Sequence, residues 1–578
     1  MDKYLTRYNT WLASLSGTEK ERLEEIGKED NLIKERFTLP LEFGTAGMRG
    51  EIDLGIGRMN IYTVRRATAG LAQFVLAENK AECGVVIAYD TRNMSLEFAL
   101  AAAEVLAAHR IKVFIYEDVR PVALCSFAVR HFGAAAGIMI TASHNPKEYN
   151  GFKVYGPDGA QMELADTQKV VNYINLIEDY FSVKAVPIKI DKTIKGLDNY
   201  KLTSYVTVIG STVDEQYYKQ VYALSLSKDV LARNADKLKI VYTPIHGTGY
   251  VPVVEMLSRI GISPILVDAQ CDRDSSFSTV KLPNPEYKET LAMGIELAQQ
   301  YGADIVMGTD PDCDRLGVAI RDSLGNFVTL SGNQIGILLF DYILERLSAT
   351  GCLPKNGAVI KTIVTSTLTD KIAESYGVTV IDVLTGFKYI GEKIKFWEQS
   401  GEYSFVFGFE ESHGYLRGTH VRDKDGVVAT MLFAEMACYL ASIGESVQSR
   451  LISLFKKYGW YTEHNFSIEY KGLQAMGQMG SIMEQLKQKP VWSLDGHKVL
   501  YNINYDKGEK LFADGAKEQV TLPKTNAVYY GLEQKDFICI RPSGTEPKLK
   551  VYVLCSADTQ DASSSKAKQL LNAVKKLL

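Results

Sequence analysis

The chain has 578 residues, which exceeds the size at which one hydrophobic core stops growing, so the sequence predicts several domains. Hydrophobic residues make up 46% of the chain and charged residues 23%, an ordinary globular composition that excludes a disordered or fibrous protein. With 65 basic and 69 acidic residues the formal net charge is −4, so no overall basic field exists to hold nucleic acid or an anionic membrane surface. Any anionic ligand must therefore be bound by local basic groups.

The cysteine pattern and the N-terminus indicate the compartment. The eight cysteines are scattered without a CxxC pair, which argues against a disulfide framework and against a zinc site. Residues 1–26 are charged and amphipathic, and they lack the apolar segment of a signal peptide. No stretch of the chain approaches the apolar length that a membrane span requires. We therefore expect a soluble protein in a reducing compartment, the cytoplasm.

After the N-terminal helical stretch, short apolar runs alternate with longer segments of helical periodicity. Residues 84–89 predict a buried strand, residues 95–108 a helix with Ser95 as its N-cap, and residues 112–116 the next strand. The same alternation predicts strands at residues 239–242, 264–267, 304–307, 358–365 and 378–383. Alternation of this kind predicts an α/β fold with largely parallel sheets.

Three apolar strands run directly into polar loops that could carry chemistry, in the segments GIMITASHNP, DIVMGTDPDCD and SFVFGFEESHG. Three related α/β domains that each offer one loop to a shared cleft would explain this recurrence, although strand ends carry ligands in α/β proteins generally. From about Phe455 the pattern changes to shorter strands and a closing helix, which predicts a smaller α+β domain. We place the four domains at residues 1–209, 210–328, 329–455 and 456–578.

The first loop, residues 141–146, has the sequence TASHNP. An Asn-Pro and an Asn-Gly turn dipeptide follow Ser143, so this serine should lie on an exposed tight turn after a buried strand, where a nucleophile is needed. A lone serine in such a place is usually only a turn residue. His144 suggests a serine hydrolase only weakly, because adjacent residues do not normally face each other and no G-x-S-x-G elbow is present.

The second loop, TDPDCDR at residues 309–315, places Asp310, Asp312 and Asp314 at alternate positions. Three carboxylates so close repel one another and would raise each other's pKa values unless a cation lies between them. The D-x-D-x-D pattern also opens an EF-hand, but that loop requires Gly at the position of Arg315 and a carboxylate at that of Arg321. Hard oxygen ligands without histidine favour Mg²⁺. A solvated acidic turn is the alternative.

The third region combines LTGFK at residues 384–388, GFEESHGY at 408–415 and THVRDKDG at 419–426. Paired carboxylates and a serine on one loop can form hydrogen bonds with adjacent sugar hydroxyls, which apolar ligands would not require. An exposed polar loop without a ligand fits this pattern equally well.

The fourth loop, RPSGTEPK at residues 541–548, combines an arginine fork, two hydroxyls and a glycine that lets the backbone approach an anion closely. It therefore predicts a phosphate site, with a surface turn of incidental charge as the alternative. No Walker P-loop or G-x-G-x-x-G motif occurs, so the phosphate should not be that of a nucleotide.

The order of these four loops along one chain resembles that of the α-D-phosphohexomutase superfamily, and LEFGTAGMRG at residues 41–50 resembles the G-T-x-G-x-R opening of that family. GFEESHGY is more similar to the GEES-type loop of phosphoglucomutases than to the GEMSGH-type loop of phosphomannomutase/phosphoglucomutases. The resemblance implies four domains around a central cleft, the first three similar mixed α/β sheets with helices on both faces and the fourth a smaller α+β domain. It further implies an intramolecular phosphotransferase that interconverts glucose 1-phosphate and glucose 6-phosphate, with Mg²⁺, a phosphoserine and bound glucose 1,6-bisphosphate.

The resemblance also assigns roles to residues. Ser143 is expected to be the phosphoserine and to complete a Mg²⁺ site with Asp310, Asp312 and Asp314. The residues expected at the site of transfer are Arg49, Lys153 and Lys424, and either lysine is a candidate for proton transfer. The expected substrate contacts are Thr45, His144, Arg315, Thr385, Gly386, Lys388, Glu410, Ser412, Arg541, Ser543, Gly544 and Thr545. His413 replaces the usual phenylalanine or tyrosine, which bears on sugar selectivity.

Other activities compete with this interpretation. Phosphomannomutase, phosphopentomutase and sugar-bisphosphate synthase are alternatives within the same class. A non-catalytic sugar-phosphate sensor belongs to a different class and would need neither Ser143 nor the three aspartates. A metal-dependent sugar phosphatase would differ by releasing phosphate to water. The expected partners are small-molecule sugar phosphates, with no nucleic acid, no membrane and no obligatory protein partner.

Overall fold

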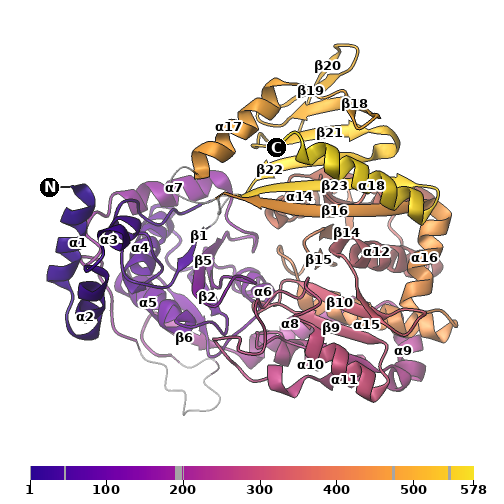
Figure 1. Ribbon diagram of the computed structural model, residues 1–578. Coiled ribbons are helices and arrows are strands. Elements are labelled where there is room, and N and C mark those ends of the chain that lie inside the picture. Colours follow the sequence, from indigo (N-terminus) through magenta and orange to yellow (C-terminus); the bar gives the residue numbers. More distant parts are fainter. Residues whose placement is uncertain (1, 45–46, 189–197, 199–200, 471–474, 544–547) are drawn as a thin grey trace.

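The computed structural model describes residues 2–44, 47–188, 198, 201–470, 475–543 and 548–578. These residues form four main sheets that follow one another along the chain (Figure 1). Three N-terminal helices, α1 Lys3–Ser14, α2 Gly17–Ile26 and α3 Asp30–Phe37, pack at the outer edge of the first part around their own apolar cluster, which contains Trp11 and Phe37. The expected α/β architecture with a separate β-rich C-terminal part is confirmed.

The first sheet is mixed and is covered by helices on both faces. Its elements are β1 Gly47–Glu51, α4 Ile61–Ala77, β2 Val85–Tyr89, α5 Ser95–Ala108, β3 Val113–Tyr116, α6 Val122–Phe132, β4 Ala136–Ile140, β5 Tyr149–Tyr155, α7 Leu164–Asn175 and β6 Val206–Ile209. The strand order is β1-β5-β4-β2-β3-β6, and only β5 runs antiparallel to the other strands, because it is antiparallel to both of its neighbours, β1 and β4. Val86 and Ala88 of β2 pack on the α6 side, and Val85 and Ile87 on the side of α4 and α5.

The second sheet has the same mixed character. Its elements are α8 Ser211–Ala223, α9 Lys228–Asn234, η1 Ala235–Lys237, β7 Ile240–Thr243, α10 Tyr250–Arg259, β8 Ile265–Leu266, η2 Asp268–Gln270, α11 Ala292–Tyr301, β9 Ile305–Thr309, β10 Leu316–Arg321 and β11 Phe327–Thr329. The strand order is β11-β10-β9-β7-β8, in which β9, β7 and β8 are parallel and β10 is antiparallel to both of its neighbours.

The third sheet is smaller but has a similar plan. Its elements are α12 Gly332–Ala349, β12 Gly357–Thr362, α13 Leu368–Tyr376, β13 Thr379–Val383, α14 Phe387–Ser400, β14 Ser404–Glu410, β15 Gly414–Leu416, α15 Gly426–Ser442 and α16 Val447–Tyr458. The strand order is β13-β12-β14-β15, and only β15 is antiparallel to its neighbour.

The fourth sheet is antiparallel in every described pair. Its elements are β16 Trp460–Glu469, α17 Ala475–Gln488, β17 Ser493–Leu494, β18 His497–Asn504, β19 Glu509–Phe512, β20 Lys517–Gln519, β21 Val528–Leu532, η3 Glu533–Lys535, β22 Phe537–Pro542, β23 Lys548–Ala557 and α18 Gln560–Lys575. Helices α17 and α18 pack on one face. The other face packs on Ile363, Val364 and Leu384 of the third part.

The first three sheets repeat one arrangement at the loops that the sequence singled out. Each loop joins a strand to its antiparallel neighbour, β4 to β5 in the first sheet, β9 to β10 in the second and β14 to β15 in the third. The expected similarity of the three domains is therefore confirmed, and it extends to the position of the loops.

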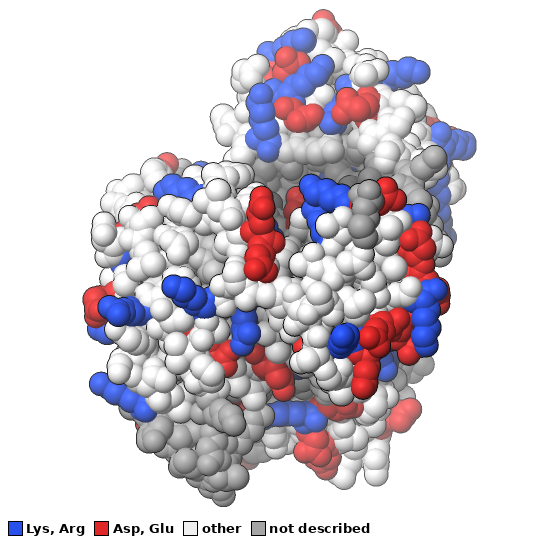
Figure 2. Space-filling view, turned by 90° about the vertical axis from the view of Figure 1, so that its left-hand side faces the viewer, with Lys and Arg blue, Asp and Glu red and all other residues white. Residues whose placement is uncertain are grey.

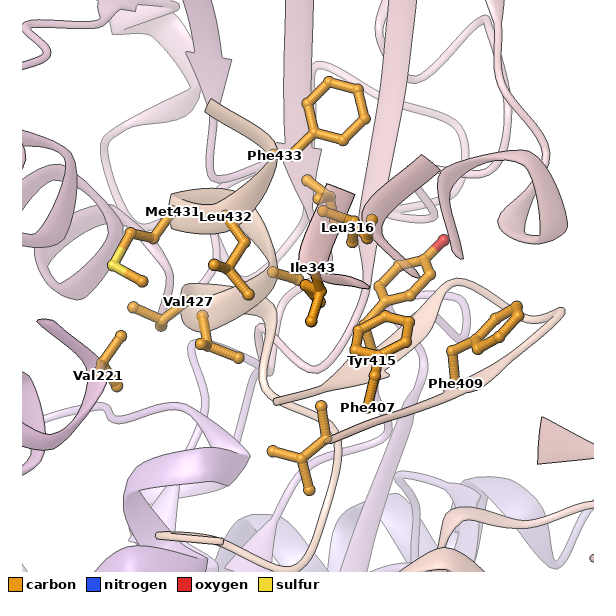
Figure 3. Close-up of a cluster of buried hydrophobic side chains, with 14 of the residues drawn as sticks. Val221, Leu316, Ile343, Phe407, Phe409, Tyr415, Val427, Met431, Leu432 and Phe433 are labelled. Atoms are coloured by element: carbon orange, nitrogen blue, oxygen red, sulfur yellow. The ribbon is translucent and has the colours of Figure 1, made fainter. Parts of the chain in front are cut away.

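The second and third parts share a hydrophobic cluster (Figure 3). It surrounds α15 and includes Val221, Leu316, Ile343, Phe407, Phe409, Tyr415, Val427, Met431, Leu432 and Phe433. Because these side chains come from α8, β10, α12, β14, β15 and α15, the second and third sheets are held together by apolar packing as well as by polar contacts.

Two local expectations were wrong. Helix α5 has the predicted bounds, but its N-cap is Met94, with a φ of 63°. The Ser95 hydroxyl instead donates to Asp90 Oδ1 at 2.6 Å, because the side chain points toward the end of β2 rather than toward the helix backbone. Strand β12 ends at Thr362 rather than at Thr365, because the chain turns there and the Thr365 N–H donates to the Thr362 carbonyl at 3.0 Å.

The surface and the cysteines agree with the general expectations. All eight cysteines are free thiols. Lys and Arg side chains are interspersed with Asp and Glu on the face shown in Figure 2. Among the described residues no single helix is long and apolar enough to cross a membrane. Helices α15 and α16 reach that length only as a pair bent by 85°, and α15 is the buried helix of Figure 3.

Candidate functional site

Ser143 follows β4 in a buried and uncommon conformation. Its φ is 53°, in the left-handed region that residues with a Cβ rarely adopt, and the residue is 4% exposed. Its hydroxyl donates to Asp310 Oδ2 at 2.7 Å, and its N–H donates to Thr141 Oγ1 at 2.8 Å. The expectation of an exposed turn was wrong, because the aspartate loop of the second sheet lies against the serine.

His144 faces the serine, contrary to the expectation for adjacent residues. Its Nδ1 lies 3.2 Å from Ser143 Oγ, which the left-handed turn at Ser143 permits. Burial lowers the pKa of His144 well below its ordinary value, and the nearby Arg315 and Arg49 guanidinium groups lower it further. The imidazole is therefore neutral at pH 7, so one ring nitrogen can accept a hydrogen bond while the other donates one.

The three aspartates converge on the turn between β9 and β10. Their ligand oxygens lie within 4.8 Å of one another, and all three residues are buried. Asp310 Oδ1 accepts hydrogen bonds from the N–H groups of Asp314 and Arg315 at 3.1 and 3.0 Å. Burial raises the pKa of Asp310 well above its ordinary value, and Asp312 and Asp314 raise it further.

These carboxylates fit a divalent cation. Among the described residues, Oδ1 of Asp312 and Oδ1 of Asp314 are buried and have no hydrogen-bond partner. A buried carboxylate oxygen without a partner is costly unless a cation or a donor reaches it. Three carboxylates without a histidine or thiolate ligand form a hard donor set, which suits Mg²⁺ better than a softer ion.

Two lysines from different domains reach the aspartates. Lys153 Nζ, on β5, lies 2.8 Å from Asp312 Oδ2 and 3.7 Å from Asp314 Oδ2. Lys424 Nζ, on the loop before α15, lies 3.2 Å from Asp314 Oδ2 and 3.2 Å from Asp423 Oδ1. Burial lowers the pKa of each lysine, but the carboxylates more than offset this effect, so both values lie above the ordinary one. Both lysines are therefore cations at neutral pH.

Two arginines complete the positive side of the site. Arg49, on β1, donates from Nη1 to Asn145 Oδ1 at 2.6 Å, next to the serine loop. Arg315 pairs with Glu286, and its Nε lies 4.0 Å from Asp310 Oδ2. Glu286 was not predicted as a site residue from the sequence. The turn-forming run PNPE at residues 283–286 could have drawn attention to it, because Pro and Asn mark an ordered loop.

The third loop brings several predicted sugar contacts together. Glu410 Oε1 accepts the Gly386 N–H at 2.8 Å, which links the end of β14 to the start of α14. Thr385 and Ser412 are half-buried on the adjoining loops. Lys388 Nζ is buried and has no hydrogen-bond partner among the described residues, and burial lowers the pKa of its side chain.

His413 contacts the second domain rather than the sugar loop alone. It is buried, with a φ of 65°, and its Nδ1 lies 3.1 Å from the Leu316 carbonyl. Its own carbonyl accepts the Leu316 N–H at 3.1 Å. The histidine therefore fixes the third loop to the first residue of β10, directly after the aspartate turn.

The fourth loop approaches the third. Arg541, on β22, donates from Nη2 to the Tyr552 hydroxyl at 3.0 Å. Burial raises the pKa of Glu411 to about 7 and Glu410 adds to this, while nearby Arg541 opposes the shift. Ser543 donates its N–H to the Lys548 carbonyl at 2.7 Å. Three predicted contacts, Thr45, Gly544 and Thr545, lie outside the described residues.

Lys550 of β23 is a further cation that the sequence analysis missed. Burial lowers its pKa, and so do the nearby Arg541 and Arg315 guanidinium groups. Like charges that act on one another in this way are compatible with a site that binds an anion. Its position two residues beyond the RPSGTEPK motif was the signal in the sequence.

Comparison with known proteins gives consistent matches over most of the chain. Residues 40–181, 215–325 and 331–458 match the family models described as phosphoglucomutase/phosphomannomutase, alpha/beta/alpha domains I, II and III. The sequence is 38% identical over 535 residues to a protein named phosphoglucomutase from Staphylococcus epidermidis, which covers 92% of this chain and 94% of that protein. It is 37% identical over 522 residues to one of the same name from Staphylococcus aureus, which covers 90% of each chain.

Solved structures match the fold. The chain is similar to a phosphoglucomutase/phosphomannomutase family protein from Burkholderia thailandensis, with a TM-score of 0.63, 17% identity and coverage of 93% of this chain and 96% of that one. It is also similar to the open form of parafusin, a phosphoglucomutase from Paramecium, with a TM-score of 0.67, 17% identity and coverage of 93% and 96%.

Proposed function

The chain belongs to the phosphoglucomutase/phosphomannomutase family, and on this premise we propose that it interconverts glucose 1-phosphate and glucose 6-phosphate through a phosphorylated Ser143. It is a phosphohexomutase, an intramolecular phosphotransferase of the isomerase class. The observation that carries the proposal is the 2.7 Å contact between Ser143 Oγ and Asp310 inside a cluster of three buried aspartates. Relatives named phosphoglucomutase favour glucose over mannose or a pentose.

We propose that Ser143, Asp310, Asp312 and Asp314 hold a Mg²⁺ ion. Phosphorylation of Ser143 adds about −1.5 to −2 charges at neutral pH, and the phosphate oxygens would be repelled by three adjacent carboxylates. When bound, Mg²⁺ would neutralise this charge and polarise the transferring phosphoryl group. The two unpaired carboxylate oxygens support this assignment.

The surrounding cations supply what phosphoryl transfer needs, which is alignment and compensation of spreading negative charge. Lys153 and Arg315 lie against the aspartates, and Arg49 binds the serine loop. The substrate hydroxyl that attacks the phosphoserine must lose its proton, and Ser143 Oγ must be stabilised as it leaves. Lys153 and Lys424, whose ammonium groups lie within 4 Å of the aspartates, are the proposed groups for this proton transfer. One ammonium would donate a proton to Ser143 Oγ as that oxygen leaves, and the amine so formed would take up the proton of the attacking hydroxyl.

The rest of the cleft would orient the sugar. Glu410 and Ser412, with Thr385, Gly386 and Lys388, are proposed to bind the hydroxyl groups, and His144 and Thr45 to border the transfer site. The non-reacting phosphate is proposed to bind at Arg541, Ser543, Gly544 and Thr545, with Lys550 beside them. The cycle requires glucose 1,6-bisphosphate to turn over between two phosphate sites, so that each phosphate is in turn transferred or anchored.

We also propose that the domains end at residues 209, 328 and 455. The same proposal includes a cytoplasmic location and no obligatory protein partner. The first, third and fourth sheets lie within these limits, whereas β11 of the second sheet, Phe327–Thr329, crosses the limit at residue 328 by one residue. An interspersed surface charge is compatible with a protein whose partners are small sugar phosphates.

A substrate panel tests the function. Purified protein is assayed with glucose, mannose, N-acetylglucosamine and ribose 1-phosphates, each with Mg²⁺ and a trace of the matching bisphosphate. We expect the highest kcat/KM for glucose 1-phosphate and a 6-phosphate product. A higher kcat/KM for mannose 1-phosphate or ribose 1-phosphate would show that the proposed glucose substrate is wrong. Release of inorganic phosphate at the rate of turnover would indicate a phosphatase, and binding without turnover would indicate a sensor.

A further inference from the structure

Arg92 is a buried arginine that binds the backbone of the serine loop. Its side chain has no exposed surface, and its guanidinium donates to four carbonyl groups of residues 143–149. Nη1 lies 2.8 Å from the Pro146 carbonyl and 3.1 Å from that of Tyr149, and Nη2 donates to the carbonyls of Ser143 and Asn145. One planar group thus joins both ends of the loop.

Asp90 lies beside the Arg92 guanidinium, on the side of Nε. Asp90, at the end of β2, has no exposed side-chain surface, and its Oδ2 lies 3.4 Å from Arg92 Nε. Asp90 Oδ1 accepts the Arg92 N–H at 3.0 Å and the Ser95 hydroxyl at 2.6 Å. Asp90 directly follows β2 and Ser95 is the first residue of α5, so Arg92 links the serine loop to the end of β2 and the start of α5.

This arrangement bears directly on the conformation of Ser143. A φ of 53° is unfavourable for serine, and it persists only where the surroundings determine it. The Arg92 fork holds the Ser143 carbonyl on one side of the residue, while Thr141 holds its N–H on the other. A lysine cannot reproduce this, because a single ammonium has no planar array of donors.

The second domain covers the guanidinium. The Phe277 ring centroid lies 5.0 Å from the Arg92 guanidinium carbon, and Phe277 is 1% exposed with a φ of 47°. Phe277 belongs to the segment between η2 and α11, which Arg273 joins to the first domain through Asp118. The domain that carries the aspartates therefore also excludes water from the residue that holds the serine.

We propose that Arg92 is a positioning residue for phosphoryl transfer, which holds Ser143 in its reactive geometry through the loop carbonyls, and that Phe277 of the second domain stabilises this state by covering the guanidinium. The expected effect on phosphoryl transfer rests on the proposed function. The expected effect on the conformation of residues 143–149 rests on the geometry alone. Arg92 acts on Ser143 without touching the sugar, so it should affect the rate of transfer more than the binding of substrate.

The test compares Arg92→Lys, Arg92→Ala and Phe277→Leu with the wild type. Arg66→Lys is the matched control. Arg66, on α4, also donates to a backbone carbonyl, that of Ile177 at 2.8 Å, and its guanidinium carbon lies 4.9 Å from the Tyr180 ring centroid, but among the described residues it makes no hydrogen bond or ion pair with the serine loop. The measurements are kcat and KM for glucose 1-phosphate, the rate of phosphoserine formation from glucose 1,6-bisphosphate, and amide hydrogen exchange of residues 143–149.

For Arg92→Lys we expect a loss of about 100-fold in kcat and in the rate of phosphoserine formation, with KM within about twofold of wild type. Amides 143–149 should exchange faster. Millimolar guanidinium should restore part of the activity of Arg92→Ala. Phe277→Leu should lose roughly threefold to tenfold in kcat, in keeping with the loss of a cation–π contact, and Arg66→Lys should match the wild type.

Several results would overturn the proposal. A kcat of Arg92→Lys within threefold of wild type, or a loss that appears in KM alone, would show that Arg92 does not position Ser143. If Arg92→Ala does not fold, Arg92→Lys alone tests the proposal.

If the wild type shows no mutase turnover, the proposed function fails. Unchanged hydrogen exchange of residues 143–149 in Arg92→Lys would refute the positioning role of Arg92 independently of any activity.

Discussion

Lys424 and Asp314 come from different domains, and the Lys424 ammonium lies 3.2 Å from Asp314 Oδ2. On the other side of the same acidic turn, Ser143 of the first domain donates to Asp310 at 2.7 Å. Three domains therefore meet at three carboxylates, and each contributes a different group: the serine, the acidic oxygens and the cation. The serine and the aspartates lie on corresponding hairpins of the first two sheets, and Lys424 lies on the loop between β15 and α15 of the third part. The proposed phosphoryl transfer needs these groups together.

We predict that Ser143→Ala abolishes mutase turnover and removes the phosphoserine. The folded state should lose about 1 to 3 kcal/mol, because the deletion leaves the buried Asp310 Oδ2 without this hydrogen-bond donor. Turnover, phosphopeptide mapping and thermal denaturation check this. Ser182→Ala, which changes an exposed serine of the same domain, is the control. Near wild-type turnover, or a phosphoryl label on another residue, would contradict the covalent role of Ser143.

We predict that Asp312→Asn lowers Mg²⁺ affinity and catalysis together. The substitution removes one of three negative ligands from a site in which Oδ1 of Asp312 has no other partner among the described residues. Calorimetric titration with Mg²⁺ measures affinity without reference to turnover, and kcat should fall by about 100-fold or more. EDTA should inactivate the wild type reversibly.

Asp304→Asn is the matched control for the metal prediction. Asp304 lies in the same domain and pairs with Arg321, but its side chain is 76% exposed. Its substitution should leave Mg²⁺ binding unchanged. Wild-type activity that persists in excess chelator would exclude the metal from the mechanism, and an Asp312→Asn variant that binds Mg²⁺ normally would remove this residue from the ligand set.

The sequence predicted the elements and the loops because both depend on local patterns. Residues 84–89 are apolar throughout, which is typical of a strand that is buried on both faces. The structure places β2 at Val85–Tyr89. The burial of Ser143 was not predictable in this way. The Asp310 carboxylate that accepts its hydroxyl lies 167 positions further along the chain, and a turn motif carries no information about what will pack on it.

The same limit explains the other omissions. Arg92 lies 51 positions before Ser143, and Glu286 lies 29 before Arg315, so neither partnership leaves a periodic signal. His144 faces Ser143 because of one backbone dihedral that a tight-turn dipeptide does not specify. Residue types in a motif can be read from the sequence, whereas the contacts that orient them depend on how the domains pack.

We predict that stability decreases as the pH rises from about 4.5 to about 7, partly through Glu411. Burial, and secondarily Glu410, raises the pKa of Glu411 in the folded state from 4.5 to about 7. A carboxyl group with a raised pKa binds its proton more tightly in the folded state, so its contribution is fully present below its unfolded pKa and is lost as the pH passes through the folded pKa. Charged Glu411 therefore destabilises the folded state at pH 8.

Glu411→Gln tests this linkage, because glutamine is similar in shape and neutral at every pH. Thermal denaturation should show a higher Tm for the variant than for the wild type at pH 8, and similar values at pH 5. Glu402→Gln, at an exposed glutamate of the third domain, should show no such difference between the two pH values. A lower Tm for Glu411→Gln at pH 8 would mean that attraction to the nearby Arg541 charge outweighs the cost of burying the Glu411 charge.

We predict that Arg541→Ala reduces kcat/KM for glucose 1-phosphate by roughly ten- to hundredfold. The substitution removes a charge-assisted contact to the non-reacting phosphate worth about 1.5 to 3 kcal/mol. Both KM and kcat should change, because binding energy from the remote end of a substrate is used to orient the reacting end. Lysine should rescue the activity only partly, since a point charge does not reproduce the planar fork that also reaches the Tyr552 hydroxyl at 3.0 Å.

Two controls distinguish binding of the non-reacting phosphate from transfer of the phosphoryl group to Ser143. Phosphoserine content in Arg541→Ala should stay near that of the wild type, because Ser143 and its aspartates belong to other domains. Lys535→Ala removes an exposed cation of the fourth domain, 71% exposed and paired with Asp370, and should leave the kinetics unchanged. An Arg541→Ala variant with normal kcat/KM would show that this loop does not hold the phosphate. One without phosphoserine would show that the fourth domain takes part in loading the serine as well as in anchoring the sugar phosphate.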